Sequence, residues 1–493
     1  MTTVQAKTFE SLNPATDEVV GTYPIHSEDE VRAAVAAARP AAEWWAGLGF
    51  AGRLERLERW KGVLTRRAQQ LAQVVHDETG KPHGDAMLEI ILAIDHTAWA
   101  ARNARKVLGP KRRSSGLLMA NQASSVEYQP LGVVGVIGPW NYPVFTPMGS
   151  IAYALAAGNA VVFKPSEYTP GVGRWLADSF AEVIPDHPVF QVVTGFGATG
   201  AALCRSGVAK IAFTGSPATG RKIMAACADT LTPVLIEAGG KDALLVDADA
   251  DLDAAAEAAI WGGMSNAGQT CTGVERVYVH ERVYDAFVAK ASEIAGSLKV
   301  GFEGDAQVGP ITMPGQIDII RRHIADALAR GGRAVVGGPV AEGDKYVQPT
   351  VLVDVPEDAP AVREETFGPT ITVTRVRDMD EAIAKANATD YGLGGTVFAR
   401  ARGMELARRL RAGMVAVNSV ISFAGVPSLP FGGVGESGFG RIHGPEGLRE
   451  FARAKAITRQ RFRAPLTMTT FARTPKVDAQ VAKLITLLHG KRR

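Results

Sequence analysis

Four short apolar runs constrain the fold of this chain more than any other feature. They are GVVGVI from residue 132, AVVFK from residue 160, KIAFTGS from residue 210 and VLIEAGG from residue 234. Helical patterns lie between them, for example at 147–157 and 217–226. Short runs that are apolar on both faces and alternate with helices are typical of a parallel sheet that is covered on both sides. This region therefore predicts a doubly wound α/β domain.

A second alternation of strand and helix follows residue 271. Strand-like runs such as VERVYVH and TITVTRV flank helical patterns at 282–298 and 380–388. Because 493 residues are too many for one hydrophobic core, this region predicts a second α/β domain. The segment 113–131 differs from both regions, since two short strand-like runs are separated by polar residues, and it predicts a hairpin arm.

The bulk composition excludes several classes of protein. The formal net charge is +3 and the basic residues form no stripe interleaved with aromatic side chains, so no nucleic-acid partner is expected. Three cysteines without regular spacing argue against a disulfide framework and for a reducing compartment. Without a Cys/His cluster, no metal site is expected. Neither a secretory signal nor an apolar run of transmembrane length occurs, which predicts a cytoplasmic protein with no integral membrane segment.

Cys271 is the strongest single candidate for chemistry. It lies in NAGQTCTG, where two glycines bracket it and neither helix nor strand is favoured. Most free cysteines are small buried hydrophobes, and that interpretation suits Cys204 and Cys227, which lie in helical or apolar surroundings. A polar loop bracketed by glycines instead favours a nucleophile. No histidine is adjacent in the sequence, so the base that activates the thiol must come from elsewhere in the chain.

Polar side chains at predicted strand ends supply the other catalytic candidates. Glu237 follows the run VLI and precedes two glycines, at the edge where parallel sheets place their sites, although a capping or salt-bridged glutamate would look the same. Asn141 in GPWNYP offers an amide donor for a developing oxyanion. Glu364 and Glu365 in REETFGP, taken alone, indicate a solvated charged turn.

Three further segments suit a dinucleotide. Lys164 and Glu167 in FKPSEYTP can bond the two hydroxyls of a ribose. FTGSPATG leaves a strand and opens a helix, so the backbone N–H groups of Gly215 and Ser216 can hold a pyrophosphate. GFGATG at 195–200 matches the GxGxxG pattern, but the acidic residue expected about twenty positions later is missing.

Seven motifs, taken in order, resemble those of the aldehyde dehydrogenase superfamily: GPWNYP, FKPSEYTP, FTGSPATG, EAGGK, NAGQTC, EETFGP and PFGGVGESGFGR. The resemblance implies three parts. They are a Rossmann-like domain that binds NAD at 1–112 and 132–238, an α/β catalytic domain at 239–445, and a small β oligomerisation arm at 113–131 and 446–464. Residues 465–493 would then be a C-terminal extension. Members of the family form dimers or tetramers, so a homodimer or homotetramer is expected.

The resemblance also implies catalytic roles. Cys271 resembles the nucleophile that forms first a thiohemiacetal and then a thioester with an aldehyde. Asn141 and the backbone N–H of Cys271 resemble the oxyanion hole, where one donor is commonly worth about 2.7–4 kcal/mol. Glu237 resembles the general base that activates water for thioester hydrolysis. The family usually has leucine where this chain has Ala238, which leaves the seating of the nicotinamide open.

The cofactor site implied by the resemblance is for NAD. Glu365 resembles the ligand of the nicotinamide-side ribose, Phe367 borders that ring, and the glycines at 195–200 form a loop near the adenine. The implied cofactor-binding residues are Pro139, Trp140, Lys164, Glu167, Gly197, Gly215, Ser216, Glu365 and Phe367. A carboxylate at Glu167 that accepts the 2′-hydroxyl would repel a 2′-phosphate, which favours NAD, although some members with this glutamate also use NADP.

The expected substrate is a neutral apolar or aromatic aldehyde. By resemblance, segments 142–159 and 418–435 line the substrate tunnel, with Tyr142, Phe145 and Phe423 as wall residues, although these aromatic side chains suit a core equally well. Neither segment contains the arginine or lysine that a substrate carboxylate would pair with. The alternatives are a semialdehyde such as succinate semialdehyde, a CoA-acylating reaction, and a non-catalytic member of the family.

The C-terminal residues predict an amphipathic helix that starts at Pro475. Apolar residues recur at helical spacing, and basic residues flank them, among them Lys476, Lys483 and Arg493. The apolar positions are Val477, Val481, Leu484, Ile485 and Leu488. Such a helix binds a membrane surface or, more often, packs on its own oligomer.

Overall fold

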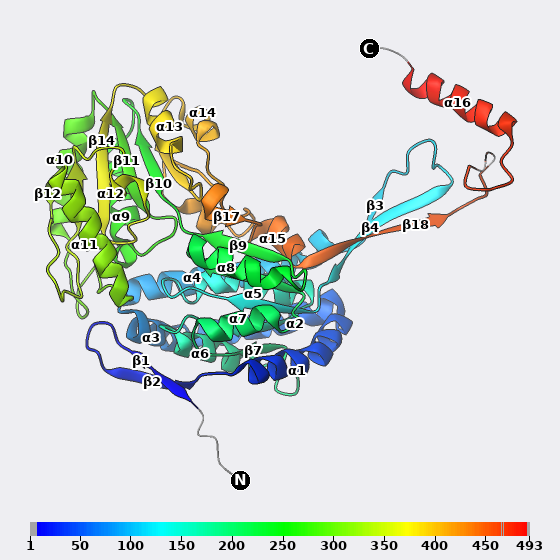
Figure 1. Ribbon diagram of the computed structural model, residues 1–493, viewed down its shortest axis with the longest axis horizontal. Helices are drawn as coiled ribbons and strands as arrows, with labels where there is room; N and C mark the ends of the chain where they lie inside the picture. The colour runs from blue at the N-terminus through cyan, green and yellow to red at the C-terminus, as the bar shows by residue number, and fades with distance from the viewer. Residues whose placement is uncertain (1–6, 465, 467, 491–493) are drawn as a thin grey trace, which may run out of the picture. The chain divides into compact units, whose positions relative to one another are not determined.

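The computed structural model describes residues 7–464, 466 and 468–490. The chain divides into two units. The larger unit comprises the residues up to Val107 and Pro130–Arg453, and it contains two large, mostly parallel sheets (Figure 1). The smaller unit comprises Leu108–Gln129 and the chain from Ala454 onward.

The first sheet has six strands in the order β17-β9-β8-β5-β6-β7. They are β5 (Val133–Ile137), β6 (Ala160–Lys164), β7 (Phe190–Val192), β8 (Lys210–Gly215), β9 (Val234–Ala238) and β17 (Gly438–Phe439). Neighbours pair in parallel except β17, which is antiparallel to β9. Every residue of β5 and β6 is buried, as an apolar strand covered on both faces requires. The predicted doubly wound sheet is confirmed.

Helices cover both faces of this sheet. They are α1 (Glu28–Gly47), α2 (Gly49–Arg66), α3 (Ala68–Thr79), α4 (His83–Leu108), α5 (Phe145–Ala157), α6 (Pro170–Ala181), α7 (Gly197–Arg205) and α8 (Pro217–Ala228). Right-handed crossovers put α5 and α6 on one face, where α2 packs on both, and put α7 and α8 on the other, where α1 packs on α7. The strand order reverses between β5 and β8, and ligands bind at such a switch point.

The second sheet has seven strands in the order β12-β13-β14-β11-β10-β15-β16. They are β10 (Asp242–Val246), β11 (Val274–His280), β12 (Arg333–Val336), β13 (Thr350–Val353), β14 (Thr370–Val376), β15 (Gly395–Phe398) and β16 (Ala416–Val417). Only β12 pairs antiparallel to its neighbour. The second α/β region predicted from the sequence is therefore present. Only three residues separate β10 from β9, so the two sheets are joined directly beside Glu237.

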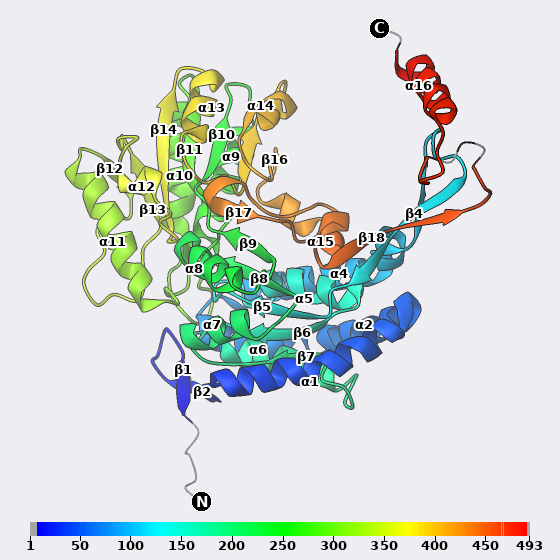
Figure 2. The same cartoon turned by 45° about the vertical axis from the view of Figure 1, so that its right-hand side comes forward.

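Helices also pack on both faces of the second sheet (Figure 2). They are α9 (Leu252–Met264), α10 (Tyr284–Ser297), α11 (Pro314–Ala329), α12 (Pro360–Arg363), α13 (Met379–Asn387) and α14 (Gly403–Arg409). One apolar cluster lies under α9 and α10 and includes Phe287. A separate cluster lies under α13 and α14 and includes Met379. The larger unit is completed by the N-terminal hairpin β1 (Thr8–Leu12) and β2 (Val19–Pro24) and by α15 (Gly444–Glu450).

The smaller unit contains a three-stranded sheet in the order β18-β4-β3 and one helix. The elements are β3 (Lys111–Arg113), β4 (Gln122–Pro130), β18 (Ala452–Gln460) and α16 (Pro475–His489). The predicted hairpin forms, with its first strand at 111–113 and the apolar residues Leu117, Leu118 and Met119 in the connection to β4. The helix predicted to begin at Pro475 is also present. Across the described part of the chain, no helix is long and apolar enough to cross a membrane.

Candidate active site

A cavity of about 750 Å³ opens where four parallel strands of the first sheet end. The loops after β5, β6, β8 and β9 line one side of it. Cys271, Glu365 and Phe367 from the second α/β region line the other side. The cavity lies at the switch point of strand order, where open α/β sheets bind their ligands.

The structure gathers the residues that the sequence assigned to a cofactor. All nine line this one cavity: Pro139, Trp140, Lys164, Glu167, Gly197, Gly215, Ser216, Glu365 and Phe367. Cys271 and Asn141 line it as well. Residues as far apart in the sequence as Pro139 and Phe367 therefore line one cavity, and their binding of a dinucleotide stays a prediction.

Two side-chain contacts lie among the residues that line the cavity. At one end, Lys164 Nζ lies 3.2 Å from Glu167 Oε2. Burial lowers the pKa of Lys164, and the Glu167 carboxylate acts in the opposite direction. A paired cation and carboxylate at a cavity wall suit the two hydroxyls of a ribose. Elsewhere in the cavity, the rings of Trp140 and Phe367 meet nearly perpendicularly, with their centroids 5.5 Å apart.

The loop that carries Cys271 is held in a left-handed backbone conformation. Asn266 and Gly268 have φ angles of 51° and 70°. A side chain at Gly268 would collide with the backbone carbonyl of Gly368, so the loop needs glycine there. Asn266 Nδ2 donates to the carbonyl of Gln269 at 3.2 Å, and Gln269 Nε2 donates back to the carbonyl of Asn266 at 2.9 Å. The polar, glycine-bracketed composition of the loop therefore fixes the cysteine at the cavity wall.

The sulfur of Cys271 faces a carboxyl group. Its Sγ lies 3.5 Å from Glu237 Oε1, and Thr214 Oγ1 donates to Glu237 Oε2 at 3.1 Å. Burial raises the pKa of Glu237 to about 7. Burial, reinforced by the charges of Glu237, Glu365 and Asp242, also raises the pKa of the Cys271 thiol well above its ordinary value. The resting thiol is therefore neutral, and it donates its proton to a carboxyl group whose pKa lies near neutral pH.

Asn141 is fixed by hydrogen bonds at both its backbone and its side chain. Its Nδ2 donates to the carbonyl of Gln269 at 2.8 Å, two residues before the cysteine. Its carbonyl accepts from Lys81 Nζ at 2.7 Å and from Asn266 Nδ2 at 3.0 Å. An amide nitrogen carries two N–H groups, so one remains for a ligand at the cavity. The predicted oxyanion donor and the predicted nucleophile thus share a hydrogen-bonded framework.

A buried ion pair supports Asn141 from behind. Lys81 Nζ lies 2.7 Å from Glu89 Oε1, and both side chains are fully buried. Glu89 Oε2 accepts the backbone N–H groups of Val144 at 3.0 Å and Phe145 at 3.1 Å, at the start of α5. Because breaking one half of such a pair leaves an uncompensated charge, the pair locks the segment that carries Asn141.

A second buried ion pair, between Lys241 and Glu275, supports the opposite wall. Glu275 accepts the backbone N–H groups of Thr366 at 2.9 Å and Phe367 at 3.0 Å. Glu365 Oε1 accepts the N–H of Gly240 at 3.0 Å, and burial raises the pKa of Glu365 to about 8. A side chain at Gly239 would collide with this carboxyl, so the EAGGK glycines allow Glu365 to approach the strand end.

None of the three predicted substrate residues is among those that line the cavity. Tyr142 Oη lies 3.0 Å from Thr270 Oγ1, next to the nucleophile in sequence, and Lys81 Nζ lies 4.2 Å from the centre of its ring. Phe145 and Phe423 are buried. A tunnel role for these side chains stays a prediction.

Sequence reasoning missed the residues that hold the loops. Lys81, Glu89, Lys241 and Glu275 act through buried pairs whose partners are 8 and 34 positions apart. The charge pattern gives no signal for such pairs, because an exposed lysine and glutamate look the same in sequence. The missed residues that line the cavity include Ser166, Tyr168, Cys204, Thr219, Lys222, Met313 and Gln316.

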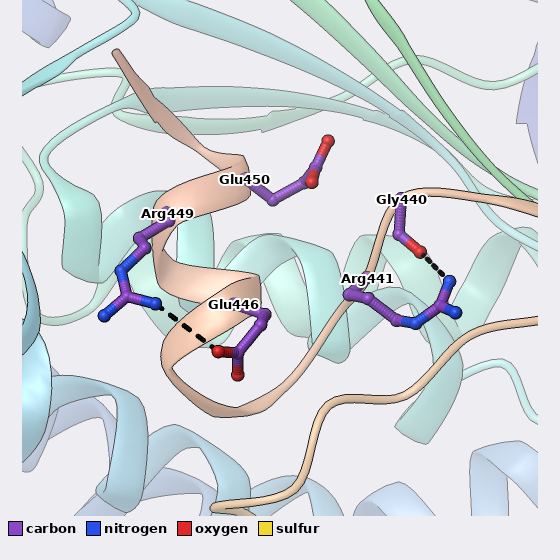
Figure 3. A pocket seen from close by; sticks show the side chains of 5 residues that line it. All are labelled: Gly440, Arg441, Glu446, Arg449 and Glu450. Atoms are coloured by element: carbon purple, nitrogen blue, oxygen red, sulfur yellow. Dashed lines mark hydrogen bonds and ion pairs between the residues drawn. The ribbon is translucent and has the colours of Figure 1, made fainter. Parts of the chain in front are cut away.

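A smaller hollow of about 350 Å³ has no comparable chemistry. Figure 3 shows its five lining residues, in which Arg449 donates to Glu446 at 3.4 Å and Arg441 donates to the carbonyl of Gly440 at 2.6 Å. Neither a thiol nor a hydroxyl lines it. Among residues 7–490 as described, no group of three potential metal ligands lies together.

Comparison with known proteins places this geometry in context. The chain matches the model of the aldehyde dehydrogenase family over residues 1–457. It is 38% identical to a 4,4'-diapolycopene aldehyde oxidase from Methylomonas, over 93% of this chain and 87% of that protein. It is 35% identical to a putative NADP(+) succinate-semialdehyde dehydrogenase from Mycobacterium ulcerans, over 90% of this chain and 87% of that protein. The crystal structure of an NAD-dependent aldehyde dehydrogenase from Sinorhizobium meliloti superimposes with a TM-score of 0.89 at 34% identity, covering 94% of this chain and 93% of that one.

The Cys271–Glu237 contact predicts how the rate of thiol alkylation depends on pH. Glu237 is mostly neutral below its pKa of about 7 and becomes a proton acceptor above it. We expect alkylation of Cys271 by iodoacetamide to accelerate as pH rises through about 7, and Glu237→Gln to abolish that step and leave only a rise at the raised pKa of the thiol itself. Mass spectrometry of the labelled peptide gives the rate, and Cys271→Ser is the blank. Equal rates for Glu237→Gln and the parent protein at pH 7.5 would contradict the assignment of the base.

Proposed function

Because the chain belongs to the aldehyde dehydrogenase family, we propose that it oxidises an aldehyde to the carboxylic acid with NAD, through a covalent adduct on Cys271. One observation carries the proposal. The Cys271 sulfur lies 3.5 Å from the Glu237 carboxyl at the wall of a cavity that all nine predicted cofactor residues line.

The cavity fits a dinucleotide by its size and its chemistry. Its volume of about 750 Å³ falls in the range of cofactor sites. Lys164 and Glu167 would hold the adenosine ribose, and Glu365 the nicotinamide ribose. Ser216 is the N-cap of α8, where unpaired backbone N–H groups favour a pyrophosphate. When bound there, NAD supplies the hydride acceptor.

The first step that the protein's own groups perform is attack by the thiol. Glu237 takes the proton from Cys271 Sγ, and the sulfur lone pair forms a bond to the aldehyde carbon. The carbonyl π electrons move to oxygen, giving the alkoxide of a thiohemiacetal. Asn141 Nδ2 and the backbone N–H of Cys271 would stabilise this oxygen, and each donor at such a site is worth about 2.7–4 kcal/mol.

The second step is hydrolysis. Loss of hydride from the adduct leaves a thioester on Cys271. Once Glu237 has passed its first proton to solvent, it accepts a proton from water, and the hydroxide attacks the thioester carbon. The C–S bond then breaks, the carboxylic acid leaves, and the Cys271 thiolate takes back a proton. A pKa of about 7 for Glu237 suits both proton transfers at neutral pH. Members that transfer the acyl group to CoA commonly lack a glutamate at this position, so its presence argues against that alternative.

The substrate proposed is a neutral apolar or aromatic aldehyde. Segments 142–159 and 418–435 contain no lysine or arginine that could pair with a carboxylate. The relative named for 4,4'-diapolycopene aldehyde supports an apolar substrate. The relative named for succinate semialdehyde supports the second candidate, a semialdehyde. We also propose a homodimer or homotetramer in which the β3–β4–β18 sheet serves as the oligomerisation arm.

Substitutions at the nucleophile and the base separate the two steps. We expect Cys271→Ala to lower kcat by more than about a thousandfold, because no covalent adduct forms. We expect Glu237→Gln to lower kcat by about 10²–10⁴-fold, since both proton transfers lose their base. Stopped-flow NADH absorbance with a panel of aliphatic, aromatic and semialdehyde substrates gives both rates and the substrate preference. Full activity of Cys271→Ala would refute the mechanism, and the exposed Glu257→Gln serves as the control.

A double-substitution cycle tests whether the Lys81–Glu89 pair acts through Asn141. We expect Lys81→Met/Glu89→Gln, which removes both charges, to lower kcat by about tenfold while the KM for NAD changes less than about twofold. In an Asn141→Ala background the same double substitution should lower kcat almost no further, because the amide donor that the ion pair positions is absent. If the double substitution lowers kcat by the same factor with and without Asn141→Ala, the ion pair acts independently of Asn141 and only stabilises the fold.

Cofactor choice should respond to Glu167. We expect Glu167→Gln to raise the ratio of kcat/KM for NADP to that for NAD by about tenfold or more, because a 2′-phosphate then meets Lys164 without the repelling carboxylate. Steady-state rates at fixed ionic strength measure the ratio. Glu182→Gln, an exposed position on the same domain, is the control. An unchanged ratio would remove Glu167 from the cofactor assignment.

A further inference from the structure

The smaller unit has a very different charge from the rest of the chain. Residues 108–129 and 454–493 contain thirteen lysines and arginines but only two acidic residues, Glu127 and Asp478, which gives a net charge of +11. The whole chain carries +3, so the remainder carries −8. The modest overall charge therefore conceals a strongly basic unit.

The same unit exposes large apolar side chains. Leu117, Leu118 and Met119, in the connection between β3 and β4, are 67%, 52% and 52% exposed. After β18, Phe462 is 53% exposed and Phe471 is fully exposed. Apolar side chains concentrated in one unit, among basic residues, indicate a surface that binds something.

The helix α16 is amphipathic and has no buried residue. Val477, Val481 and Leu484 are half-buried at helical spacing, while Ile485 and Leu487 remain 45% and 72% exposed. Its lysines, Lys476 and Lys483, are exposed, and three more basic residues follow in the sequence at 491–493. The family match ends at residue 457, so family membership does not account for this helix.

We propose that the basic, apolar surface formed by residues 461–464, 466 and 468–490 of this unit binds the surface of a membrane that contains anionic lipids. Apolar side chains of α16 enter the interface between headgroups and acyl chains, and the basic side chains meet the lipid phosphates and carboxylates. With 15 residues, α16 lies on a bilayer and does not span it.

Charge favours a membrane over the other occupants. An anionic bilayer offers neutralising charge together with an apolar layer, whereas two copies that meet through this unit would oppose +11 with +11. Contact of α16 with the acidic larger unit of a second copy is the competing outcome of the test. Nucleic acid would neutralise the charge too, but it leaves the exposed leucines without an apolar partner. The proposed apolar aldehyde would partition into bilayers, so docking would bring the enzyme to its substrate. This last link rests on the proposed function, and membrane binding itself does not.

The test is vesicle co-sedimentation of the full chain. We expect binding to phosphatidylcholine vesicles that contain about 30% phosphatidylserine, no binding to phosphatidylcholine alone, and release as salt rises from about 0.1 M to about 0.5 M, because screening shortens the reach of the basic residues. Failure to bind either vesicle, or equal binding to both, overturns the proposal. Because no aldehyde is present, the result is independent of the proposed function.

Matched variants locate the surface. Lys476→Glu/Lys483→Glu and Ile485→Ser/Leu487→Ser should each weaken vesicle binding at least about tenfold while kcat for a water-soluble aldehyde stays unchanged, because these side chains are exposed. Lys290→Glu/Lys299→Glu changes net charge equally on the larger unit and should bind as the parent does. Vesicle binding by both α16 variants at the parent's level overturns the proposal. The proposal is also overturned if the parent chain binds transfer RNA but not vesicles. It is overturned too if the α16 substitutions change only the oligomeric state.

Discussion

A thiol held against a carboxyl, with no cation beside it, is the constraint on which the rest of this site depends. Burial and three acidic neighbours raise the pKa of Cys271, so the protein does not store a reactive thiolate. The proton has to be removed when the substrate arrives, and Glu237, 3.5 Å away with a pKa of about 7, is suited to do it. That contact requires the end of β9 in one sheet and the loop before β11 in the other to meet.

Two buried ion pairs hold the chain segments around this contact in place. Lys81 and Glu89 hold the segment from Asn141 to the start of α5, and Lys241 and Glu275 hold the backbone at Thr366. Burying charges costs several kcal/mol per ion, so such pairs add little stability by themselves. Here every pair also bonds backbone groups of a cavity loop, and an apolar replacement could not do so. Their contribution is to fix the walls on both sides of the sulfur.

The sequence made the strand ends predictable, because apolar runs and the glycines that follow them are local signals. Glu237 lies at the end of β9, and Asn141, Lys164 and Ser216 line the cavity at the same edge of the sheet, while their roles stay predictions. The supporting pairs were not predictable, because the meaning of Lys81 depends on Glu89 and on a carbonyl sixty positions away. The hairpin arm was found, but its apolar run is the connection and not a strand, since polar Lys111–Arg113 pairs with β4. The pairing of β3 with β4 therefore does not follow the apolar residues of this segment.

Asp242 is a further buried acid whose charge raises the pKa of the Cys271 thiol. Asp242 follows Lys241 at the start of β10, is buried, and accepts the N–H of Gly394 at 3.0 Å through Oδ1, while Oδ2 has no partner among the described residues. Burial raises the pKa of Asp242 to about 7 and that of Glu365 to about 8, so at neutral pH part of the Asp242 population and most of the Glu365 population is protonated. A protonated acid avoids the cost of an unpaired buried charge. Burial therefore reduces the negative charge around a sulfur that must lose a proton. Glu237 and Asp242 have similar pKa values, and the 3.5 Å contact of Glu237 with the sulfur makes Glu237 the proton acceptor.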